Sequence, residues 1–244
     1  MPGPEVVVVC DLDRVADVIA EEVRGAVPGE IPERLCAVAV RLLPVTGASV
    51  SLSGDGVPVP LGASSEQAAR LMEIQATLGD GPCLQAAETG APVLASDLTA
   101  GRDAVRWPVY AQQAAAAGVR AVYALPLGNR AVCVGTLDLY REAPGELDAR
   151  DLRTARLVAG VMTVALTGLS HRDEDGDPTD EPALDWLASD HDEIYQAMGM
   201  IMAQLGVGAE EALARLRGYA FAHDRTVLDV AHDVVALRWT LDYD

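Results

Sequence analysis

A short acidic segment, residues 171–182 (HRDEDGDPTDEP), constrains the fold of this chain more than any other stretch. It holds six acidic residues and one Arg, and one Gly and two Pro interrupt it. Because like charges repel and proline cannot continue a helix, we do not expect a packed core to run through it. We therefore predict a linker at residues 171–183. An N-terminal helix at 1–29 and a domain at 30–170 precede it, and a smaller domain at 184–244 follows.

The composition predicts a folded protein of the cytoplasm. Half of the 244 residues are apolar, which is enough for a core, and the formal net charge is −19 at pH 7. No uninterrupted run of about eighteen apolar residues is present, so we expect no membrane span. The apolar run Val6–Cys10 lacks the basic flank of a secretory signal. The four cysteines are scattered and form no C-x-x-C pair, so we expect them to be reduced.

The pattern of residues 30–170 predicts an α+β domain. Short apolar segments separated by glycine turns indicate two β-hairpins, at residues 48–61 and 119–140. Pro58 and Pro60 place the second strand of the first hairpin at a sheet edge, because proline cannot donate to a ladder. We therefore expect an antiparallel sheet flanked by helices. Apolar spacing predicts those helices at residues 31–43, 65–78, 107–117 and 147–169.

The C-terminal segment predicts a small all-α domain of three helices. The first helix carries QAMGMIMAQLG (residues 196–206), the second carries EEALARLRGYAFAH (210–223) and the third carries TVLDVAHDVVALRW (226–239). About sixty residues is close to the lower limit for a core that folds alone, so these helices must bury nearly all their apolar side chains. Thr226 and Asp229 have the spacing of a capping box for the third helix.

This three-helix pattern resembles the ANTAR domain, an RNA-binding module of bacterial transcription antiterminators. The first helix carries Ala-x-Gly-x-x-Met and the second carries Ala-x-x-x-Leu-Arg-x-x-Ala. Met198 stands where the ANTAR pattern often has Lys or Arg. The residues that carry the resemblance are Ala197, Gly199, Met202, Ala212, Leu216, Arg217 and Ala220.

The preceding domain resembles a GAF domain, of the kind found upstream of ANTAR domains in actinobacterial proteins. The resemblance rests on LGDGPCLQAAETGAPVLASDL (78–98), RWPVYAQQAAAAGVRAVYALPL (106–127) and VGTLDLY (134–140). It implies a GAF-like antiparallel sheet flanked by helices, followed by the three-helix ANTAR domain. GAF domains as a class bind cyclic nucleotides, tetrapyrroles and other small molecules, and some bind none.

The GAF resemblance places a small-molecule pocket between the sheet and the segment that covers it, residues 78–103. A few polar groups in an apolar concavity are typical of such a site. Alternatively, the same residues are loop caps and core residues of a domain without a ligand. Cys83 follows Gly-Pro, so it is either a thiolate favoured by a helix N-terminus or a buried structural thiol. The pocket residues we expect are Asp80, Cys83, Gln85, Asp97, Trp107 and Tyr123.

The ANTAR resemblance implies an RNA hairpin of a nascent transcript as the partner. Arg217 carries the family's Arg, and a guanidinium suits a phosphate or a guanine edge. Alternatively, Arg217 forms a salt bridge to Asp229 or Asp233. Residues 183–244 hold eleven acidic residues against four Arg, so either the Arg cluster on one face, or a dimer doubles the surface, or RNA binding is reduced. The RNA-binding residues we expect are Gly199, Met202, Arg217, Ala220, Arg225 and Arg238.

The first C-terminal helix also carries a heptad pattern that favours a homodimer. The predicted helix at 147–169 is long enough to pair with a second copy as well. Alternatively, the whole apolar surface serves the three-helix core of one chain. The residues at the heptad positions are Leu184, Leu187, His191, Ile194, Met198, Ile201 and Leu205.

Together these features predict a signal-responsive regulator of transcription antitermination. The alternative is a GAF-mediated protein-interaction adaptor with reduced or no RNA binding. A redox enzyme that depends on Cys83 is a third class. The sequence contains no Ser-His-Asp, P-loop or G-x-G-x-x-G pattern in a usable context, and its histidines lack ligand spacing. We therefore predict that the protein is not an enzyme and needs no metal or cofactor.

Overall fold

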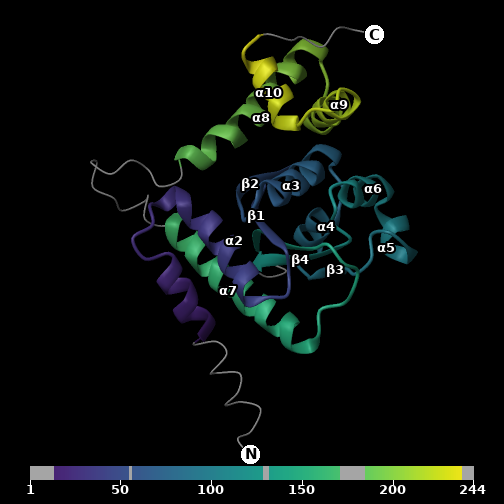
Figure 1. Cartoon of the computed structure of the whole chain (residues 1–244). Coiled ribbons are helices and arrows are strands. Elements are labelled where there is room, and N and C mark those ends of the chain that lie inside the picture. The colour runs from purple at the N-terminus through teal and green to yellow at the C-terminus, as the bar shows by residue number, and fades with distance from the viewer. Residues whose placement is uncertain (1–13, 55–56, 129–131, 171–184, 238–244) are drawn as a thin grey trace, which may run out of the picture.

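The chain forms a sheet domain followed by a three-helix domain (Figure 1). The computed structural model describes residues 14–54, 57–128, 132–170 and 185–237, so the predicted linker at 171–183 lies outside the described residues. Within these ranges no helix is long and apolar enough to cross a membrane.

The sheet has five antiparallel strands in the order β2-β1-β5-β4-β3, as the α+β prediction required. The two predicted hairpins are confirmed, since β1 pairs with β2 and β4 pairs with β5. Strand β2 lies at one edge, which agrees with the prolines in it. The strands are β1 (Gly47–Gly54), β2 (Val57–Ala63), β3 (Val93–Ala95), β4 (Ala121–Gly128) and β5 (Cys133–Arg141).

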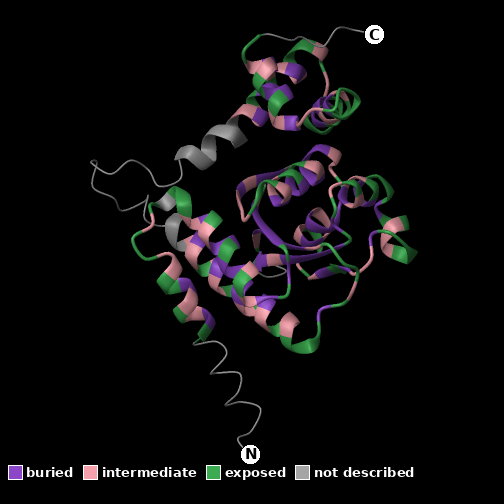
Figure 2. Ribbon diagram, in the orientation of Figure 1, coloured by how far each residue is buried: buried purple, intermediate pink, exposed green. Residues whose placement is uncertain are grey.

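Helices cover both faces of the sheet (Figure 1). Helices α2 and α7 pack on one face together with a helical segment at residues 14–22, and α3, α4 and α6 pack on the other. Because successive strand residues point to opposite faces, Leu137 belongs to the first core and Asp138 faces α3. Figure 2 shows buried residues along the strands and on the inward sides of the helices. The bounds are η1 (Pro28–Glu30), α2 (Ile31–Leu42), α3 (Glu66–Leu78), α4 (Pro82–Thr89), α5 (Gly101–Arg106), α6 (Pro108–Ala116) and α7 (Ala149–Ser170).

Local sequence signals fix both ends of α3, a helix that contacts both the sheet and the three-helix domain. Ser65 caps its start by accepting a hydrogen bond from the Ala68 amide at 3.2 Å. Gly79 ends it with a left-handed φ of 65°, a conformation that costs glycine little. The next helix, α4, starts immediately afterwards with Pro82 in its first turn.

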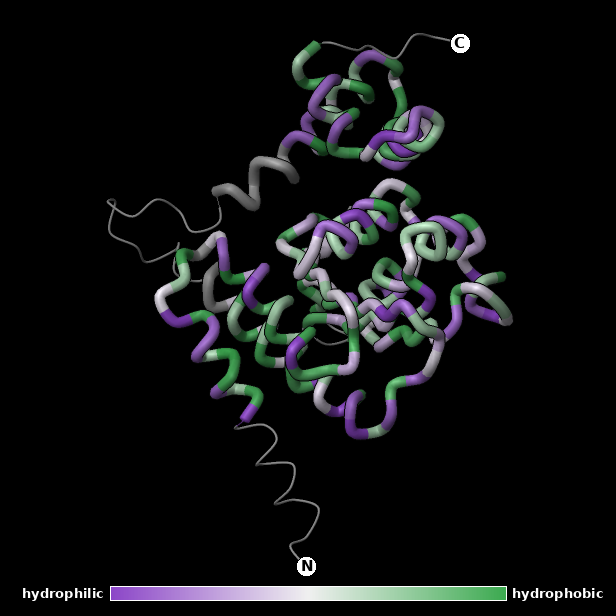
Figure 3. Tube along the Cα trace, in the orientation of Figure 1, coloured by the Kyte–Doolittle hydropathy of each residue, from purple (hydrophilic) through white to green (hydrophobic). Residues whose placement is uncertain are grey.

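The three-helix domain consists of α8 (Asp185–Leu205), α9 (Ala209–Ala222) and α10 (Val227–Val235). Alternating hydrophobic and hydrophilic residues along these helices leave one face of each for the core (Figure 3). The predicted capping box of α10 is confirmed, with the Asp229 amide donating to Thr226 Oγ1 at 3.0 Å.

The heptad prediction is wrong for the part of α8 whose side chains the structure describes. Ile194, Met198 and Ile201 are buried in the core of their own domain, so they are not a surface for a second copy. Leu205 is partly buried and packs against the same core. The alternative, that this surface serves the three-helix core, holds for these positions. The side chains of Leu184, Leu187 and His191 lie outside the described residues.

Candidate functional site

The face of the sheet toward α3 carries a buried polar stripe. Ser49 lies opposite Asp138 in the register of β1 and β5, and Ser51 lies opposite Thr136. Ser51 Oγ and Thr136 Oγ1 are 3.0 Å apart, and all four residues are buried. Because burying a polar group costs free energy unless it is hydrogen-bonded, a stripe of this kind in the two central strands needs a reason beyond packing.

Asp138 is the centre of this stripe. Gln75 Nε2, from α3, donates a hydrogen bond to Asp138 Oδ2 at 2.7 Å, and the Tyr140 hydroxyl lies 3.5 Å from the same oxygen. Burial raises the pKa of Asp138 to about 7, although the hydrogen bonds from Gln75 and Tyr140 oppose this shift. The carboxyl group therefore changes its protonation state close to neutral pH, where a small change in its surroundings decides its charge.

Two buried polar atoms, one on Asp138 and one on its neighbour Tyr110, have no hydrogen-bond partner within the described part of the chain. They are Asp138 Oδ1 and the hydroxyl of Tyr110, which comes from α6. An unsatisfied buried polar group costs about 1–3 kcal/mol. The arrangement is therefore suited to a polar group that the surrounding side chains do not supply. We refer to Ser49, Gln75, Cys83, Tyr110, Asp138 and Tyr140 as the Asp138 cluster.

A single side chain, Gln75, joins the Asp138 cluster to the start of α4. Gln75 Oε1 accepts the Cys83 amide at 2.8 Å while its Nε2 donates to Asp138. Gly81 lies directly against the Gln75 side chain, because a Cβ added at Gly81 would come within 2.6 Å of Gln75 Oε1. The segment after α3 is therefore fitted tightly over the cluster.

A hollow of about 570 Å³ lies on the outer side of that segment. Three of the predicted pocket residues, Asp80, Gln85 and Trp107, line it together with Gly81. Arg106 also lines it and stacks over the Trp107 ring at 4.8 Å from the centroid. Since Gly81 contacts the hollow on one side and Gln75 on the other, its backbone separates the hollow from the Asp138 cluster.

Two predicted pocket residues are elsewhere, and the structure corrects them. Tyr123 faces the opposite side of the sheet, where its hydroxyl donates to the Gly145 carbonyl at 2.6 Å. Its neighbour Val122 faces the α3 side instead, because successive side chains of a strand point to opposite faces of the sheet. Asp97 caps a loop, accepting the Thr99 amide at 2.8 Å and the Thr99 hydroxyl at 2.6 Å, and these bonds lower its pKa.

Cys83 lies in the first turn of α4, as predicted, but it is fully buried. Burial, followed by the nearby Asp138, raises the pKa of its thiol well above the ordinary value. A protonated, enclosed thiol is a poor nucleophile. The geometry therefore favours the structural alternative for Cys83 and gives the redox class no support.

Our sequence prediction missed Gln75 and Asp138, although the sequence contains a signal for the second. The segment Thr136-Leu-Asp-Leu-Tyr140 alternates polar and apolar residues, as a strand with one polar face does. The opposite strand shows the same alternation at Ser49 and Ser51. Only strand register shows that these two polar faces coincide.

Arg217 on α9 reaches out of the three-helix domain and onto the sheet domain. Its Nε donates to the Ala76 carbonyl, in the last turn of α3, at 3.2 Å. The guanidinium also packs over Gly79, where an added Cβ would meet Nη1 at 2.5 Å. Burial at this boundary leaves Arg217 half-exposed and lowers its pKa. The last carbonyls of a helix lack partners and carry the negative end of its dipole, so a cation stabilises this helix end.

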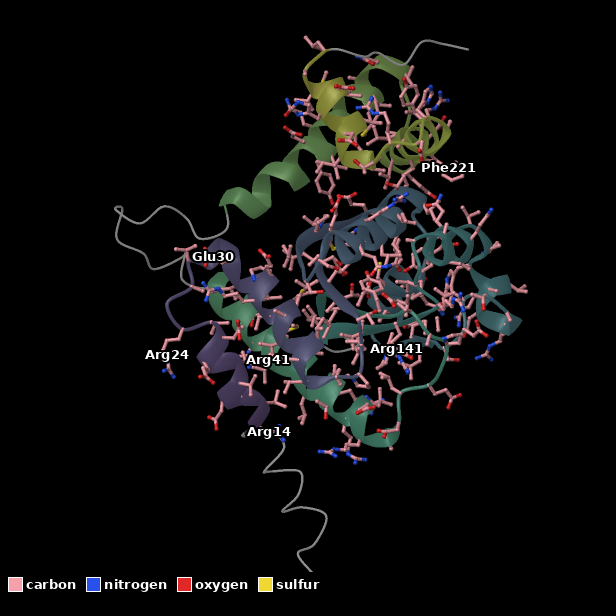
Figure 4. All side chains as sticks on the ribbon, in the orientation of Figure 1. Arg14, Arg24, Glu30, Arg41, Arg141 and Phe221 are labelled. Carbon is pink, nitrogen blue, oxygen red and sulfur yellow. The ribbon has the colours of Figure 1, made fainter. Side chains whose placement is uncertain are left out.

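The two domains also meet at the start of α10. The Val227 amide, in the first turn of that helix, donates to Thr77 Oγ1 at 3.3 Å in a buried position. Beside this contact lies a hollow of about 740 Å³, lined by Glu73 and Arg70 of α3 and by Phe221 and Asp229 of the other domain. Phe221, labelled in Figure 4, is 51% exposed at this boundary. Partial burial and then Asp229 raise the pKa of Glu73, while Arg70 opposes them.

The remaining predicted RNA-binding residues have different environments. Gly199 is exposed on α8 with open space beside it, and Met202 is half-buried against the core. Arg225 forms an ion pair with Asp233 at 2.8 Å and donates to the Asp229 carbonyl. Ala220 is fully buried, which corrects its assignment as a contact residue, because it packs in the core. Arg238 lies outside the described residues.

An α+β domain with a polar cluster at its centre, followed by a small helical domain, defines a two-domain regulatory protein. Residues 27–167 match the family model of the GAF domain, and residues 188–235 match that of the ANTAR domain. The chain therefore belongs to the GAF family, and it is a GAF–ANTAR protein. This organisation is that of a signal-sensing, RNA-binding regulator of antitermination.

Two solved GAF domains agree with the fold. The GAF domain of a phosphoenolpyruvate-protein phosphotransferase from Coxiella burnetii aligns with a TM-score of 0.52 and 13% identity, over 68% of this chain and 98% of its own. The GAF domain of the same kind of enzyme from Acinetobacter aligns with a TM-score of 0.50 and 8% identity, over 69% and 98%. A free methionine-R-sulfoxide reductase from Neisseria meningitidis has a TM-score of 0.48 and 17% identity, over 68% and 92%. At these identities the likeness concerns the fold alone. A comparison with curated proteins gives no match.

Proposed function

We propose that this protein is a cytoplasmic regulator whose ANTAR domain binds a hairpin in a nascent transcript and whose GAF domain responds to a small polar molecule. The observation that carries the proposal is the direction of Arg217. Leu216 and Ala220 on the same helix fill the domain core, whereas the Arg217 guanidinium projects outward. A guanidinium that points out of its own domain can contact a partner at the surface of that domain.

The chemistry of Arg217 suits an RNA hairpin. A guanidinium donates in a planar fork that fits a phosphate or a guanine edge, and hairpin loops expose such edges. The exposed backbone at Gly199 allows close approach on α8. Met202, Arg225 and Arg238 complete the proposed RNA-binding set. With eleven acidic residues against four Arg in residues 183–244, a single copy binds weakly, and a homodimer would double the surface.

The Asp138 cluster is the proposed place of the signal. Asp138 Oδ1 and the Tyr110 hydroxyl are the atoms that a ligand would satisfy, the first as acceptor or donor according to its protonation. A ligand reaching them would pass the Gly79–Leu84 segment, whose Asp80 and Gly81 line the hollow together with Gln85 and Trp107. Small-molecule sites commonly combine an enclosed apolar wall with a few such polar groups.

A binding experiment with two matched variants tests the RNA part of the proposal. The full chain is titrated with a pool of RNA hairpins that have a fixed stem and a randomised loop. Arg217→Ala should weaken binding at least tenfold. It should also reduce the slope of log affinity against log salt concentration by about one. Arg215→Ala removes a guanidinium two residues away, which is exposed and paired with Glu211 at 2.7 Å, and should change affinity less than twofold.

The second candidate function is a GAF-mediated protein-interaction adaptor. The acidic balance of the ANTAR domain favours it, because phosphate contacts dominate affinity for nucleic acid. Equal, measurable RNA binding by wild type and Arg217→Ala would support the adaptor and reject our proposal. Sedimentation of the full chain tests the homodimer that both functions allow.

A further inference from the structure

The last turn of α3 faces both candidate sites at once. On its inner side, Gln75 holds Asp138 and the Cys83 amide. On its outer side, the Ala76 carbonyl accepts Arg217, and Thr77 Oγ1 accepts the Val227 amide. These residues are consecutive, so the turn cannot change on one side without moving the groups on the other.

The outer side of the turn is closely fitted to the ANTAR domain. Both hydrogen bonds satisfy helix-end groups that would otherwise lack a partner, a last-turn carbonyl of α3 and a first-turn amide of α10. Gly79 has a left-handed φ of 65°, and a Cβ added there would displace the Arg217 guanidinium from its present position. This degree of fit indicates a defined docked state.

The docked state and RNA compete for Arg217. Its guanidinium is half-buried against the end of α3, and a helix carbonyl and an RNA phosphate cannot occupy the same face of it. If RNA binds only the undocked chain, the apparent affinity falls in proportion to the undocked fraction. A chain that is undocked one-tenth of the time binds RNA about tenfold more weakly than a chain that is always undocked.

We infer that the last turn of α3, residues 75–79, is an intramolecular latch that keeps the ANTAR domain docked with Arg217 withheld from RNA, and that the Asp138 cluster controls it through Gln75. The inference rests on the proposed function of Arg217. A ligand that binds Asp138 and Tyr110 would open the latch only if it favours the arrangement of Gln75 found in the undocked chain.

Two variants open the latch by independent routes, and one controls for charge. Thr77→Arg removes the acceptor for the Val227 amide and sets a like charge beside Arg217. Gly79→Ala places a Cβ where the guanidinium lies. Gln112→Arg adds the same charge as Thr77→Arg at an exposed position of α6. Amide exchange at residues 226–230 reports docking, and titration with the hairpin RNA pool reports binding, both on the full chain.

We expect both latch variants to speed exchange at residues 226–230 and to bind RNA at least tenfold more tightly than Gln112→Arg. Arg217→Ala added to Thr77→Arg should abolish the gain. Faster exchange without tighter RNA binding overturns the latch but leaves the proposed function intact, and so does unchanged exchange in both variants. If no variant binds RNA, or if the added Arg217→Ala has no effect, the proposed function fails and the latch fails with it.

The link to the Asp138 cluster has its own matched pair on α3. Gln75→Glu replaces the donor to Asp138 by a second carboxylate and should open the latch from inside. Gln67→Glu makes the same chemical change at the other end of α3, where Gln67 Nε2 donates to the Ala117 carbonyl at 2.7 Å. We expect Gln75→Glu alone to raise RNA affinity, at least fivefold, with faster exchange at 226–230. Equal behaviour of the two variants would overturn the link, and thermal melts show whether both are folded.

Discussion

The two faces of the central sheet come from the same strands, yet they bury different chemistry. Toward α2 and α7, Leu125, Leu137 and Leu139 are fully buried among aliphatic side chains. Toward α3, the equally buried Asp138 and Thr136 need specific partners. Aliphatic burial is favourable whatever the neighbours are, whereas a buried polar group is costly unless its geometry is met. The first face therefore stabilises the domain, and the second holds an arrangement that stability alone does not require.

The largest expected effect comes from the aliphatic face. Leu137→Ala should lower the free energy of unfolding by about 2–5 kcal/mol, because it leaves a cavity in the central strand. Leu94→Ala, at a 39% exposed position of edge strand β3, is the control and should cost less than about 1.5 kcal/mol. Denaturant unfolding followed by circular dichroism measures both. Equal costs would show that the aliphatic face is not the stabilising one.

At the centre of the polar face, a substitution should stabilise the chain instead of destabilising it. Asp138→Asn keeps an oxygen to accept from Gln75 and removes a charge whose burial is unfavourable, so at pH 8 it should stabilise the chain by on the order of 2–4 kcal/mol. Glu142→Gln, an exposed change close by, should alter the unfolding free energy by less than about 0.5 kcal/mol. Destabilisation by Asp138→Asn would mean that the carboxylate is better satisfied than its surroundings suggest.

The same carboxyl group predicts a pH dependence. Its folded pKa, about 7, is raised above the ordinary 3.8, so the folded state binds the proton more tightly. The stabilisation linked to this proton is fully present below about pH 4 and is lost as the pH rises to about 7. Above that pH, this group causes no further change in the free energy of unfolding. The difference in unfolding free energy between Asp138→Asn and wild type should therefore grow from pH 4 to 7 and level off. A constant difference across that range would contradict the raised pKa.

Removing one tyrosine hydroxyl from each face of the sheet compares the cost of losing a hydrogen bond on the two faces. Tyr140→Phe strands Ser49 Oγ, its partner at 2.7 Å, in a buried position and should cost about 1–2 kcal/mol. Tyr123→Phe, on the other face, frees the carbonyl of Gly145, a residue of the loop after β5, and should cost about 0.5–1 kcal/mol. The ranking of the two unfolding free energies is the readout. The reverse order would show that burial of the partner does not decide the cost.

The smallest effect is expected when both partners of a polar pair are replaced together. Ser51→Ala or Thr136→Val alone should each cost about 1 kcal/mol, since each leaves the other hydroxyl unpaired. The double variant should be close to wild type, within about 0.5 kcal/mol, because apolar groups need no partner there. A double-mutant cycle of unfolding free energies tests this. Additive costs would mean that the polar face contributes to stability after all.

Much of the fold followed from local pattern. The two hairpins, the edge position of β2 and the capping box of α10 depend on residues near one another in the chain. Asp80, Gln85 and Trp107 line one hollow, and their role in binding a ligand stays a prediction. The pocket prediction was wrong for Tyr123, since a single residue of strand register reverses the face that a side chain meets.

By itself, the sequence determined the elements and their family, because helix spacing, strand alternation and turn residues act over a few positions. Only the tertiary structure decided that Gln75 touches Asp138 and that Arg217, 141 residues from Ala76, lies on its carbonyl. Those contacts depend on how helices dock on a sheet and on each other. No local preference encodes that docking, since it is set by the shape and charge of surfaces that exist only after the elements have packed.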